Sequence, residues 1–222
     1  MVKKNLEERV ARLEDLHQIQ NLMGKMMYLL SAGMNEEIVE LYAHKTPGVS
    51  AEISDWGYFE GIEGVKKIYL GIHHEIERDR IGFILEHDLT TPIIEVAGDG
   101  KTAKGIWAVP GFQTAREEKC GKMRAFWDWV KYAVDFVKED GNWRFWHFKV
   151  YLTFYTPFNE GWVESAEKAA KLPPKDPSIP VWKNYPPDKP TTYHNPYSLS
   201  GVRELAPAIP EPYETYTDPL IK

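Results

Sequence analysis

The stretch from Lys122 to Phe154 constrains the fold most strongly, because it reads as two long β-strands joined by a tight turn. Aromatic and β-branched residues fill both halves, at a density that favours a pleated, half-buried surface. Asp140 and Gly141 stand between the halves, and both tolerate the positive φ angles that a two-residue hairpin turn requires. The sequence therefore predicts a long antiparallel hairpin.

The two faces of the second strand differ in chemistry, since alternate side chains of a strand point to opposite sides. After Arg144, one face is wholly apolar: Trp146, Phe148, Val150, Leu152 and Phe154. The other face mixes rings with polar groups: Trp143, Phe145, His147, Lys149, Tyr151 and Thr153. Because ligand pockets combine apolar walls with a few polar groups, we expect the mixed face to line a pocket. Contact with solvent or with a partner chain is the alternative.

The preceding segments predict an α+β fold. Apolar residues recur every three or four positions from Leu6 to Leu30, as in an amphipathic helix, and Gly33 supplies a C-cap. The other expected elements are helices over 35–43 and 61–78 and strands over 49–53, 85–96 and 102–115. Helices followed by long antiparallel strands describe a cone, in which a curved sheet wraps around the first helix.

Composition excludes several classes of protein. The net charge of −6 gives no basic field for nucleic acid. A single cysteine, Cys120, excludes an internal disulfide framework and a cysteine-based zinc site, and it fits a reducing compartment. The N-terminal residues lack the apolar core of a signal peptide, and no run is long enough to span a bilayer. We therefore expect a cytoplasmic protein without a membrane partner.

The last part of the chain differs from the rest. Twelve of the sixteen prolines lie between Pro173 and Pro219, and such a segment cannot form its own core. It nevertheless keeps rings, including Trp182, Tyr193 and Tyr216. We therefore divide the chain into a domain over 1–160 and an extension over 161–222. The extension is expected to carry a short helix near 164–171 and then an extended arm, packed on the domain or on a neighbouring subunit. A floppy tail is the alternative.

Four motifs, in their order and spacing, resemble the SnoaL-like group of the NTF2-like superfamily. They are Leu13–Ile19, Gly61–Val65, His87–Val96 and Tyr132–Phe145, and the resemblance covers roughly Leu6 to Phe154. It implies a cone-shaped fold, usually dimeric or trimeric, with one deep pocket in each subunit. It also implies cofactor-free chemistry, as in scytalone dehydratase, the bile acid 7α-dehydratase, ketosteroid isomerases and polyketide cyclases. Other members only bind ligands.

The resemblance also suggests site residues. Dehydratases of this group place a histidine near the start of the strand matched by 85–96, where His87 stands, and a tyrosine late in the first helix, where Tyr28 is the candidate. An aspartate usual in that helix is replaced by Ser31 or Gly33, and residues 105–111 hold no acid or imidazole. The familiar pair of histidine and aspartate is thus not visible in the sequence.

Elimination of water, or movement of a double bond, needs a base for a carbon-bound proton and a group that stabilises the resulting oxyanion. His87 is the expected base, because an imidazole titrates near neutrality. Tyr28 and Lys149 are expected to hold the oxygen. His147 is the partner acid or an alternative base, and Tyr132 is a further donor. Each has a structural alternative: a capped or packed histidine, a lysine extended into solvent, or a tyrosine that packs its helix.

Four further residues are candidates for substrate binding: Trp56, Trp107, Trp129 and Asp55. Rings in a sheet more often form plain core, and Asp55 suits the turn that follows residues 49–53. Asp128 is a further carboxylate near rings, with Arg124 and Lys131 as nearby ion-pair partners in the sequence. No metal is expected, because His73 and His74 are adjacent and the i, i+4 histidine spacing of a zinc helix is absent.

The sequence therefore predicts a cofactor-independent lyase or isomerase acting on a hydroxylated, ring-containing small molecule, aromatic, steroid or polyketide-like. A non-catalytic binding protein with the same pocket is the second interpretation. An assembly protein, with side chains filling the cavity and the arm as its interaction element, is the third.

Overall fold

The computed structural model describes residues 5–116, 121–169 and 180–220, so Cys120 lies outside the described part. Helix α1 spans Leu6–Ala32 and begins with a capping box, in which Asn5 accepts from the amide of Glu8 and the Glu8 carboxylate accepts from the amide of Asn5. It ends at Gly33, whose φ of 67° lies in the left-handed region that glycine adopts at low cost.

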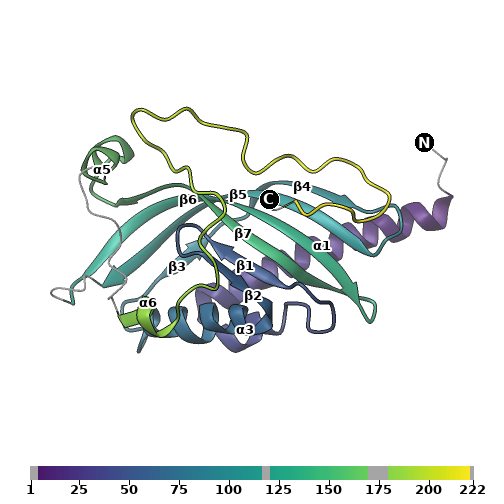
Figure 1. The fold of residues 1–222 in the computed structure, drawn as a ribbon, viewed down its shortest axis with the longest axis horizontal. Helices are drawn as coiled ribbons and strands as arrows, with labels where there is room; N and C mark the ends of the chain where they lie inside the picture. The colour runs from purple at the N-terminus through teal and green to yellow at the C-terminus, as the bar shows by residue number, and fades with distance from the viewer. Residues whose placement is uncertain (1–4, 117–120, 170–179, 221–222) are drawn as a thin grey trace.

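A seven-stranded sheet curves around α1 and does not close on itself (Figure 1). Its strands are β1 (Ser50–Ile53), β2 (Tyr58–Glu60), β3 (Leu85–His87), β4 (Thr90–Val96), β5 (Thr102–Arg116), β6 (Met123–Glu139) and β7 (Asn142–Pro157). The order is β2-β1-β7-β6-β5-β3, and β4 also pairs with β5. Strand β1 runs parallel to β7, whereas the other pairs are antiparallel. The predicted α+β cone is confirmed.

The smaller elements depart from the sequence prediction in detail. The other helices are α2 (Asn35–Val39), α3 (Gly61–Lys66), the π-helix η1 (Lys67–His73), α4 (His74–Glu77), α5 (Trp162–Ala169) and α6 (Pro180–Asn184). Helix α2 stops before Ala43, because Tyr42 forms a parallel bridge with Phe145. The expected single strand over 85–96 is divided into β3 and β4, and β2 was not predicted. The helix expected near 164–171 corresponds to α5, and Lys171 lies outside the described residues.

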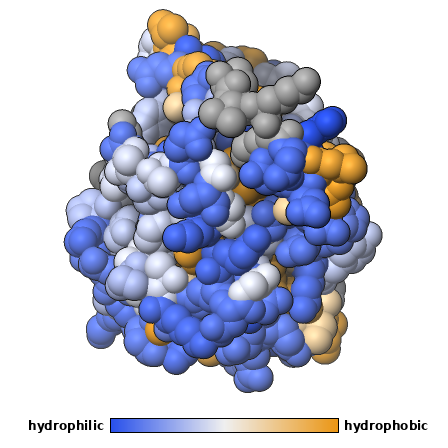
Figure 2. All heavy atoms as spheres, turned by 90° about the vertical axis from the view of Figure 1, so that its right-hand side faces the viewer, coloured by the Kyte–Doolittle hydropathy of each residue, from blue (hydrophilic) through white to orange (hydrophobic). Residues whose placement is uncertain are grey.

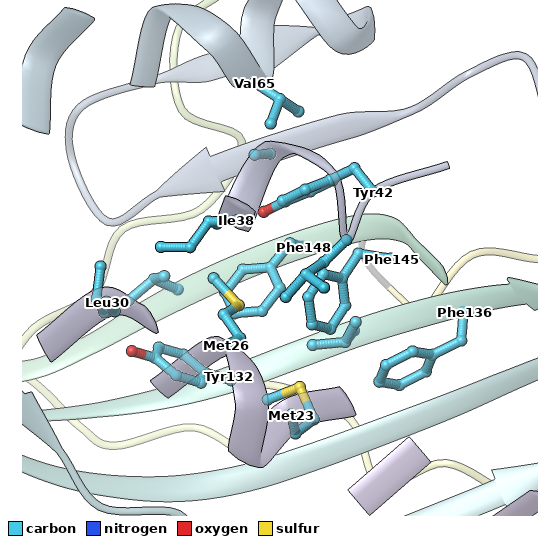
Figure 3. Packing of buried hydrophobic residues seen from close by; sticks show 14 of the residues in the cluster. Met23, Met26, Leu30, Ile38, Tyr42, Val65, Tyr132, Phe136, Phe145 and Phe148 are labelled. Atoms are coloured by element: carbon cyan, nitrogen blue, oxygen red, sulfur yellow. The ribbon is translucent and has the colours of Figure 1, made fainter. Parts of the chain in front are cut away.

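The core lies between α1 and the concave face of the sheet (Figure 3). Ile19, Met23, Met26 and Leu30 form the buried side of α1. They pack against rings from the two longest strands: Tyr132, Phe136, Phe145 and Phe148. Burial of several large side chains in one cluster is the main force that holds the helix to the sheet, at about 1.5–3 kcal/mol for each fully buried side chain.

Two β-bulges between β6 and β7 decide which side chains face the core. At the first, Asp135 pairs with His147 while Phe136 pairs with Phe145, so Trp146 is an extra residue on β7. The predicted alternation of faces is therefore wrong along this strand. Trp143 and Phe145 lie on the core side before the bulge, and Phe148 and Val150 lie there after it. The polar residues of β7 consequently face the convex side of the sheet.

The C-terminal arm covers part of that convex side. The backbone of Lys189 accepts from and donates to Tyr58 in β2, and the backbone of Tyr197 donates to Thr153 in β7. Two buried carboxylates of the sheet also hold it. Glu52 accepts hydrogen bonds from Thr191 and from both the amide and the hydroxyl of Thr192.

The second of these carboxylates is Asp135, which is completely buried. It accepts from the hydroxyl of Tyr216 at 2.9 Å, from the amide of Leu220 at 3.1 Å and from His147 Nδ1 at 3.0 Å. The proline-rich arm thus supplies further hydrogen-bond donors to carboxylates that lie buried beneath it.

The end of the molecule shown in Figure 2 is mostly hydrophilic, with scattered hydrophobic side chains. Exposed rings gather instead near α5, at the opposite end of Figure 1: Phe112, Trp127, Trp129, Phe158 and Trp162. Among the described residues, no helix combines the length and apolar character needed to cross a bilayer.

Glu52 offers a test of how the sheet and the arm are held. Its side chain and that of Lys149 are buried and lie 3.0 Å apart. Because removal of one partner leaves the other charge buried and unpaired, Glu52→Gln should lower the free energy of unfolding by about 3 kcal/mol. The double variant with Lys149→Met should recover most of this loss. Urea unfolding measures both, and an equal loss in the double variant would contradict the ion-pair interpretation.

The same variant should show a defined pH dependence. Burial acts to raise the pKa of Glu52, but hydrogen bonds from Thr191, Lys149 and Thr192 outweigh it and leave the pKa below the ordinary value of 4.5. A carboxyl with a lower pKa in the folded state stabilises the fold above its ordinary pKa and loses this contribution as the pH falls through the lowered value. The difference in the free energy of unfolding between wild type and Glu52→Gln should therefore become smaller as the pH falls below the ordinary pKa of a glutamate.

Candidate active site

Three residues meet in one cross-strand row on the concave face of the sheet. His87 of β3 pairs with Gly111 of β5, and Gly111 pairs with Asp128 of β6. Residues that are direct neighbours across paired strands point to the same face of a sheet. The row therefore places an imidazole and a carboxylate on either side of a residue that has no side chain.

The two side chains meet over Gly111. His87 Nε2 lies 2.8 Å from Asp128 Oδ2, and His87 Nδ1 lies 2.5 Å from the hydroxyl of Tyr132. The side chains of His87 and Asp128 are only 12% and 6% exposed, and Tyr132 is buried in the core. The sheet thus holds a chain of three polar groups, Asp128–His87–Tyr132, largely away from water.

Glycine at position 111 is what permits this contact. A Cβ atom built there would lie 2.3 Å from His87 Cδ2 and 2.4 Å from Asp128 Oδ1. Both distances are far below a normal contact, so any other residue would push the imidazole and the carboxylate away from the strand.

The chemistry of the three groups fixes the direction of the hydrogen bonds. A carboxylate only accepts, so His87 Nε2 carries the hydrogen and donates to Asp128. Neutral imidazole then has a lone pair on Nδ1, which accepts from the hydroxyl of Tyr132. Burial, with the nearby charge of Asp128 and the presence of Tyr69, raises the pKa of Tyr132 well above its ordinary value. The phenol therefore keeps its proton as the donor of this chain.

The structure reveals a histidine–aspartate pair that the sequence analysis did not find. The aspartate comes from β6 rather than from the first helix or from residues 105–111. Arg124 and Lys131 were considered as partners of Asp128, whereas its observed partner is His87. One signal was present: Asp128, Val130, Tyr132 and Val134 share one parity, so an acid stands in line with a core face.

The polar residues of β7 lie on the opposite side of the sheet from His87. His147 contacts Asp135 and the arm residue Tyr216, at 3.0 and 3.3 Å. Lys149 forms an ion pair with Glu52 and a hydrogen bond with Thr192 of the arm. The expectation that these two residues join His87 in one pocket is wrong, because the β-bulge at Trp146 turns them to the convex face.

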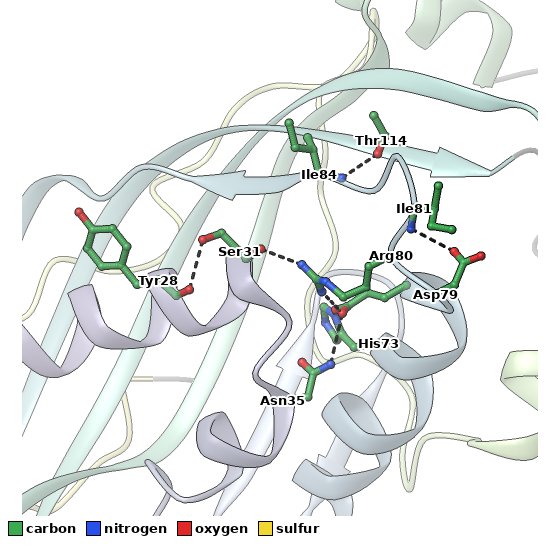
Figure 4. A network of polar contacts seen from close by, with 10 residues as sticks. Tyr28, Ser31, Asn35, His73, Asp79, Arg80, Ile81, Ile84 and Thr114 are labelled. Atoms are coloured by element: carbon green, nitrogen blue, oxygen red, sulfur yellow. Dashed lines mark hydrogen bonds and ion pairs between the residues drawn. The ribbon is translucent and has the colours of Figure 1, made fainter.

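The side chain of Tyr28 is 81% exposed, whereas His87 and Asp128 are largely buried. Figure 4 shows its ring pointing away from the polar network at the end of α1. In that network Arg80 donates to the backbone oxygen of Ser31 and pairs with the buried carboxylate of Glu77, which also contacts His73 and Asn35. The network joins α1, α2 and α4, and the exposed ring of Tyr28 takes no part in the hydrogen bonds of His87, so its role remains a prediction.

The remaining candidates are dispersed. Trp107 is buried on the concave face, where its ring leans over Gly105 and contacts Phe136. Trp56 packs against His73 and Trp182, and the exposed Asp55 lies in the turn after β1. Trp129 faces the convex side, contacts Phe154 and is 42% exposed. Among these residues, only Trp107 shares the face of His87.

The structure also shows where open space lies. A hollow of about 440 Å³ lies between the convex face and the arm, and its lining includes Lys104, Tyr151, Tyr193 and Tyr213. A second hollow, of about 490 Å³, lies between the end of α1 and η1. Side chains of the core cluster pack between α1 and the sheet. Within the described ranges, no three His, Cys, Asp or Glu side chains converge as metal ligands would.

This fold and this row define a class of proteins: α+β cones with polar groups on the concave face of the sheet. The model of the SnoaL-like domain matches residues 11–149, and the chain belongs to this family. No curated protein sequence matches the chain.

Solved structures with the same fold include several proteins named as enzymes. A hexachlorocyclohexane dehydrochlorinase (LinA) type 2 is 15% identical, with a TM-score of 0.57 over 76% of this chain and 99% of the other. A putative scytalone dehydratase from Novosphingobium aromaticivorans is 19% identical, with a TM-score of 0.55 over 69% and 94%. A putative dehydratase of the NTF2-like family from Streptomyces avermitilis is 15% identical, with a TM-score of 0.51 over 62% and 95%. At these identities the likeness concerns the fold.

Gly111 provides a test of the row. Gly111→Ala should separate His87 from Asp128 and lower the free energy of unfolding by about 1–3 kcal/mol, because the added methyl overpacks the site. The histidine ¹⁵N NMR signals should report the loss of the Nε2–H···carboxylate bond. Gly24→Ala is the matched control, since no atom lies within 4 Å of the added methyl and alanine favours a helix. An unchanged His87 signal in Gly111→Ala would refute the close approach.

Proposed function

We propose that this chain is an acid–base enzyme of the lyase or isomerase type, which acts on a hydroxylated, ring-containing small molecule without a cofactor. The observation that carries the proposal is the chain Asp128–His87–Tyr132 on the concave face of the sheet. An imidazole held by a carboxylate on one side and a phenol on the other is suited to moving a proton near neutral pH.

The reaction class follows from what these groups supply. A base removes a proton from carbon next to a carbonyl or phenol, and the electron pair moves toward the oxygen. An acid then returns a proton, either to a leaving hydroxyl, which departs as water, or to another carbon, which moves the double bond. Two of the similar structures are named as dehydratases and one as a dehydrochlorinase. Both names describe elimination reactions of this kind, which supports the proposal.

The proposal retains two of the residues suggested by the sequence, His87 and Tyr132, and adds Asp128. It omits Tyr28, Lys149 and His147, because their side chains lie on other surfaces. Trp107 remains a candidate wall of the site, since it shares the concave face.

A second candidate function, as a non-catalytic assembly protein, is favoured by one observation. Side chains such as Met26, Tyr42 and Phe148 fill the interior of the cone, where the sequence predicted a pocket. In that case the exposed rings near α5 and the arm would carry the interactions, and no small molecule would be turned over.

Turnover of a substrate panel separates the two candidates. Wild type should dehydrate or isomerise at least one member of a panel of β-hydroxy ketones fused to aromatic, steroid or polyketide rings, with the products identified by mass spectrometry. The double variant His87→Gln/Asp128→Asn should lower the rate by about 100-fold or more, because it removes both acid–base groups of the chain. His147→Gln is the matched control, a histidine paired with an aspartate on the other face. Equal activity of wild type and the double variant would exclude the proposed site.

A further inference from the structure

The hydrogen bonds of the site leave one atom without a partner. Both nitrogens of His87 are engaged, one by Tyr132 and one by Asp128. The single hydrogen of the Tyr132 hydroxyl is directed to Nδ1. Asp128 Oδ2 accepts from His87, whereas Asp128 Oδ1 is buried and has no hydrogen-bond partner in the described part of the chain. The only uncommitted basic atom of the row is therefore a carboxylate oxygen.

We propose that Asp128 Oδ1, and not the imidazole of His87, is the atom that takes the proton from the substrate. This inference rests on the proposed function and assigns its chemistry to a particular atom. His87 is then a positioning residue, which holds the carboxylate through Nε2–H, and Tyr132 holds His87 through Nδ1.

The cost of the unpaired oxygen supports this assignment. A buried acceptor without a partner destabilises a fold by about 1–3 kcal/mol, and more when it is charged, so such atoms are rare in native proteins. Within the described ranges, the other buried side-chain atoms of this kind are Asn35 Oδ1 and Ser54 Oγ. Neither belongs to a group that is basic near neutral pH. Asp128 is thus distinguished by carrying an unpaired atom that can accept a proton.

The next residue of the row indicates what lies beside this oxygen. Asp128 of β6 pairs with Tyr155 of β7. The row therefore continues on the same face of the sheet as His87–Gly111–Asp128–Tyr155. Tyr155 is 38% exposed, and its ring stacks on Phe126 with centroids 4.7 Å apart. Burial and the charge of Asp128 raise the pKa of Tyr155. The row therefore reaches solvent at an aromatic ring.

This arrangement favours a flat substrate. A planar ring that stacked on Tyr155 would lie over the residue that pairs with Asp128 in the sheet, and stacked rings gain about 0.5–1.5 kcal/mol beyond the area they bury. A saturated, puckered ring loses this contact. The substrate class is therefore an aromatic or conjugated ring with an acidic C–H bond at its edge.

The proposed step balances without a co-reactant. The C–H bond of the substrate breaks, an O–H bond forms on Asp128 Oδ1, and the electron pair passes into the conjugated system or expels the leaving group. The hydrogen on His87 Nε2 stays on the imidazole. The proton on Asp128 then leaves with the departing oxygen or returns to another carbon, which restores the carboxylate.

A model elimination tests the assignment with the full-length chain. 5-Nitrobenzisoxazole is a planar ring whose C–H bond breaks as its N–O bond opens, and it yields a coloured phenolate without any added reagent. Wild type should accelerate this reaction beyond free acetate at equal concentration. Asp128→Asn should lose about 100-fold or more, because the base is removed. His87→Gln should lose less than about 10-fold, in kcat rather than KM, since the amide still donates to the carboxylate.

The pH profile of wild type gives a measurement that needs no variant. A carboxylate base keeps its rate as the pH falls through about 6.5, where an ordinary imidazole gains its proton, whereas an imidazole base loses its rate there. His147→Gln is the matched control for removal of a histidine and should leave the reaction unchanged, because that side chain contacts Asp135 and the arm. Circular dichroism verifies that each variant is folded.

The outcomes separate this inference from the function on which it rests. A large loss in Asp128→Asn with a flat rate through the imidazole range supports Asp128 as the base. A larger loss in His87→Gln than in Asp128→Asn, or a rate that falls near pH 6.5, would show that His87 is the base. That result would overturn the assignment to Asp128 but agree with the proposed acid–base function. Absence of acceleration by wild type, or full activity in both variants, overturns the inference and the acid–base function together.

Discussion

The pairing of β6 with β7, interrupted by bulges, is the constraint on which the rest of the structure depends. These strands carry the rings that pack on α1, and each bulge exchanges the faces of every residue beyond it. The bulges lie at Trp146 and at Thr153 of β7. Between them, Phe148 and Val150 point to the core, while His147 and Lys149 point to the convex side. One extra residue at Trp146 therefore decides that the polar groups of β7 meet the arm instead of His87.

The sequence was sufficient for the class of fold but not for the faces of its central strand. A capped amphipathic helix, a hairpin with Asp140 and Gly141 at its turn, and dense rings are local signals, and each was observed where it was expected. A β-bulge has no comparable local signal, since either parity of β7 offers apolar residues to the core. The sequence did not predict the contact of Asp128 with His87, for a related reason. Its partner His87 lies on a strand two positions away in the sheet, across Gly111, and such a contact depends on the register of two strand pairs.

The arm explains why the convex face tolerates so many polar groups. Glu52, Asp135 and Lys149 are almost fully buried, and charged groups in that position require partners. Threonine and tyrosine hydroxyls and a backbone amide of the arm donate to the two carboxylates, and the hydroxyl of Thr192 accepts from Lys149. The proline-rich composition excludes a core of its own, yet the rings and donors spaced along the arm pair with the sheet. The polar groups of the arm are thus placed to bond the charged side chains of the convex face.

The histidine–aspartate pairs His87–Asp128 and His147–Asp135 differ in how many hydrogen bonds each carboxylate accepts. Asp135 accepts from His147, from Tyr216 and from the amide of Leu220, so both of its oxygens are used and the pair serves to hold the arm. Asp128 accepts from His87 alone among the described residues, and its second oxygen lies buried without a donor. A carboxylate with every lone pair occupied is a structural group, whereas one held rigidly through a single oxygen retains an acceptor for a substrate. The pair on the convex face therefore holds the arm, whereas the pair on the concave face is the one to which we assign the proposed chemistry.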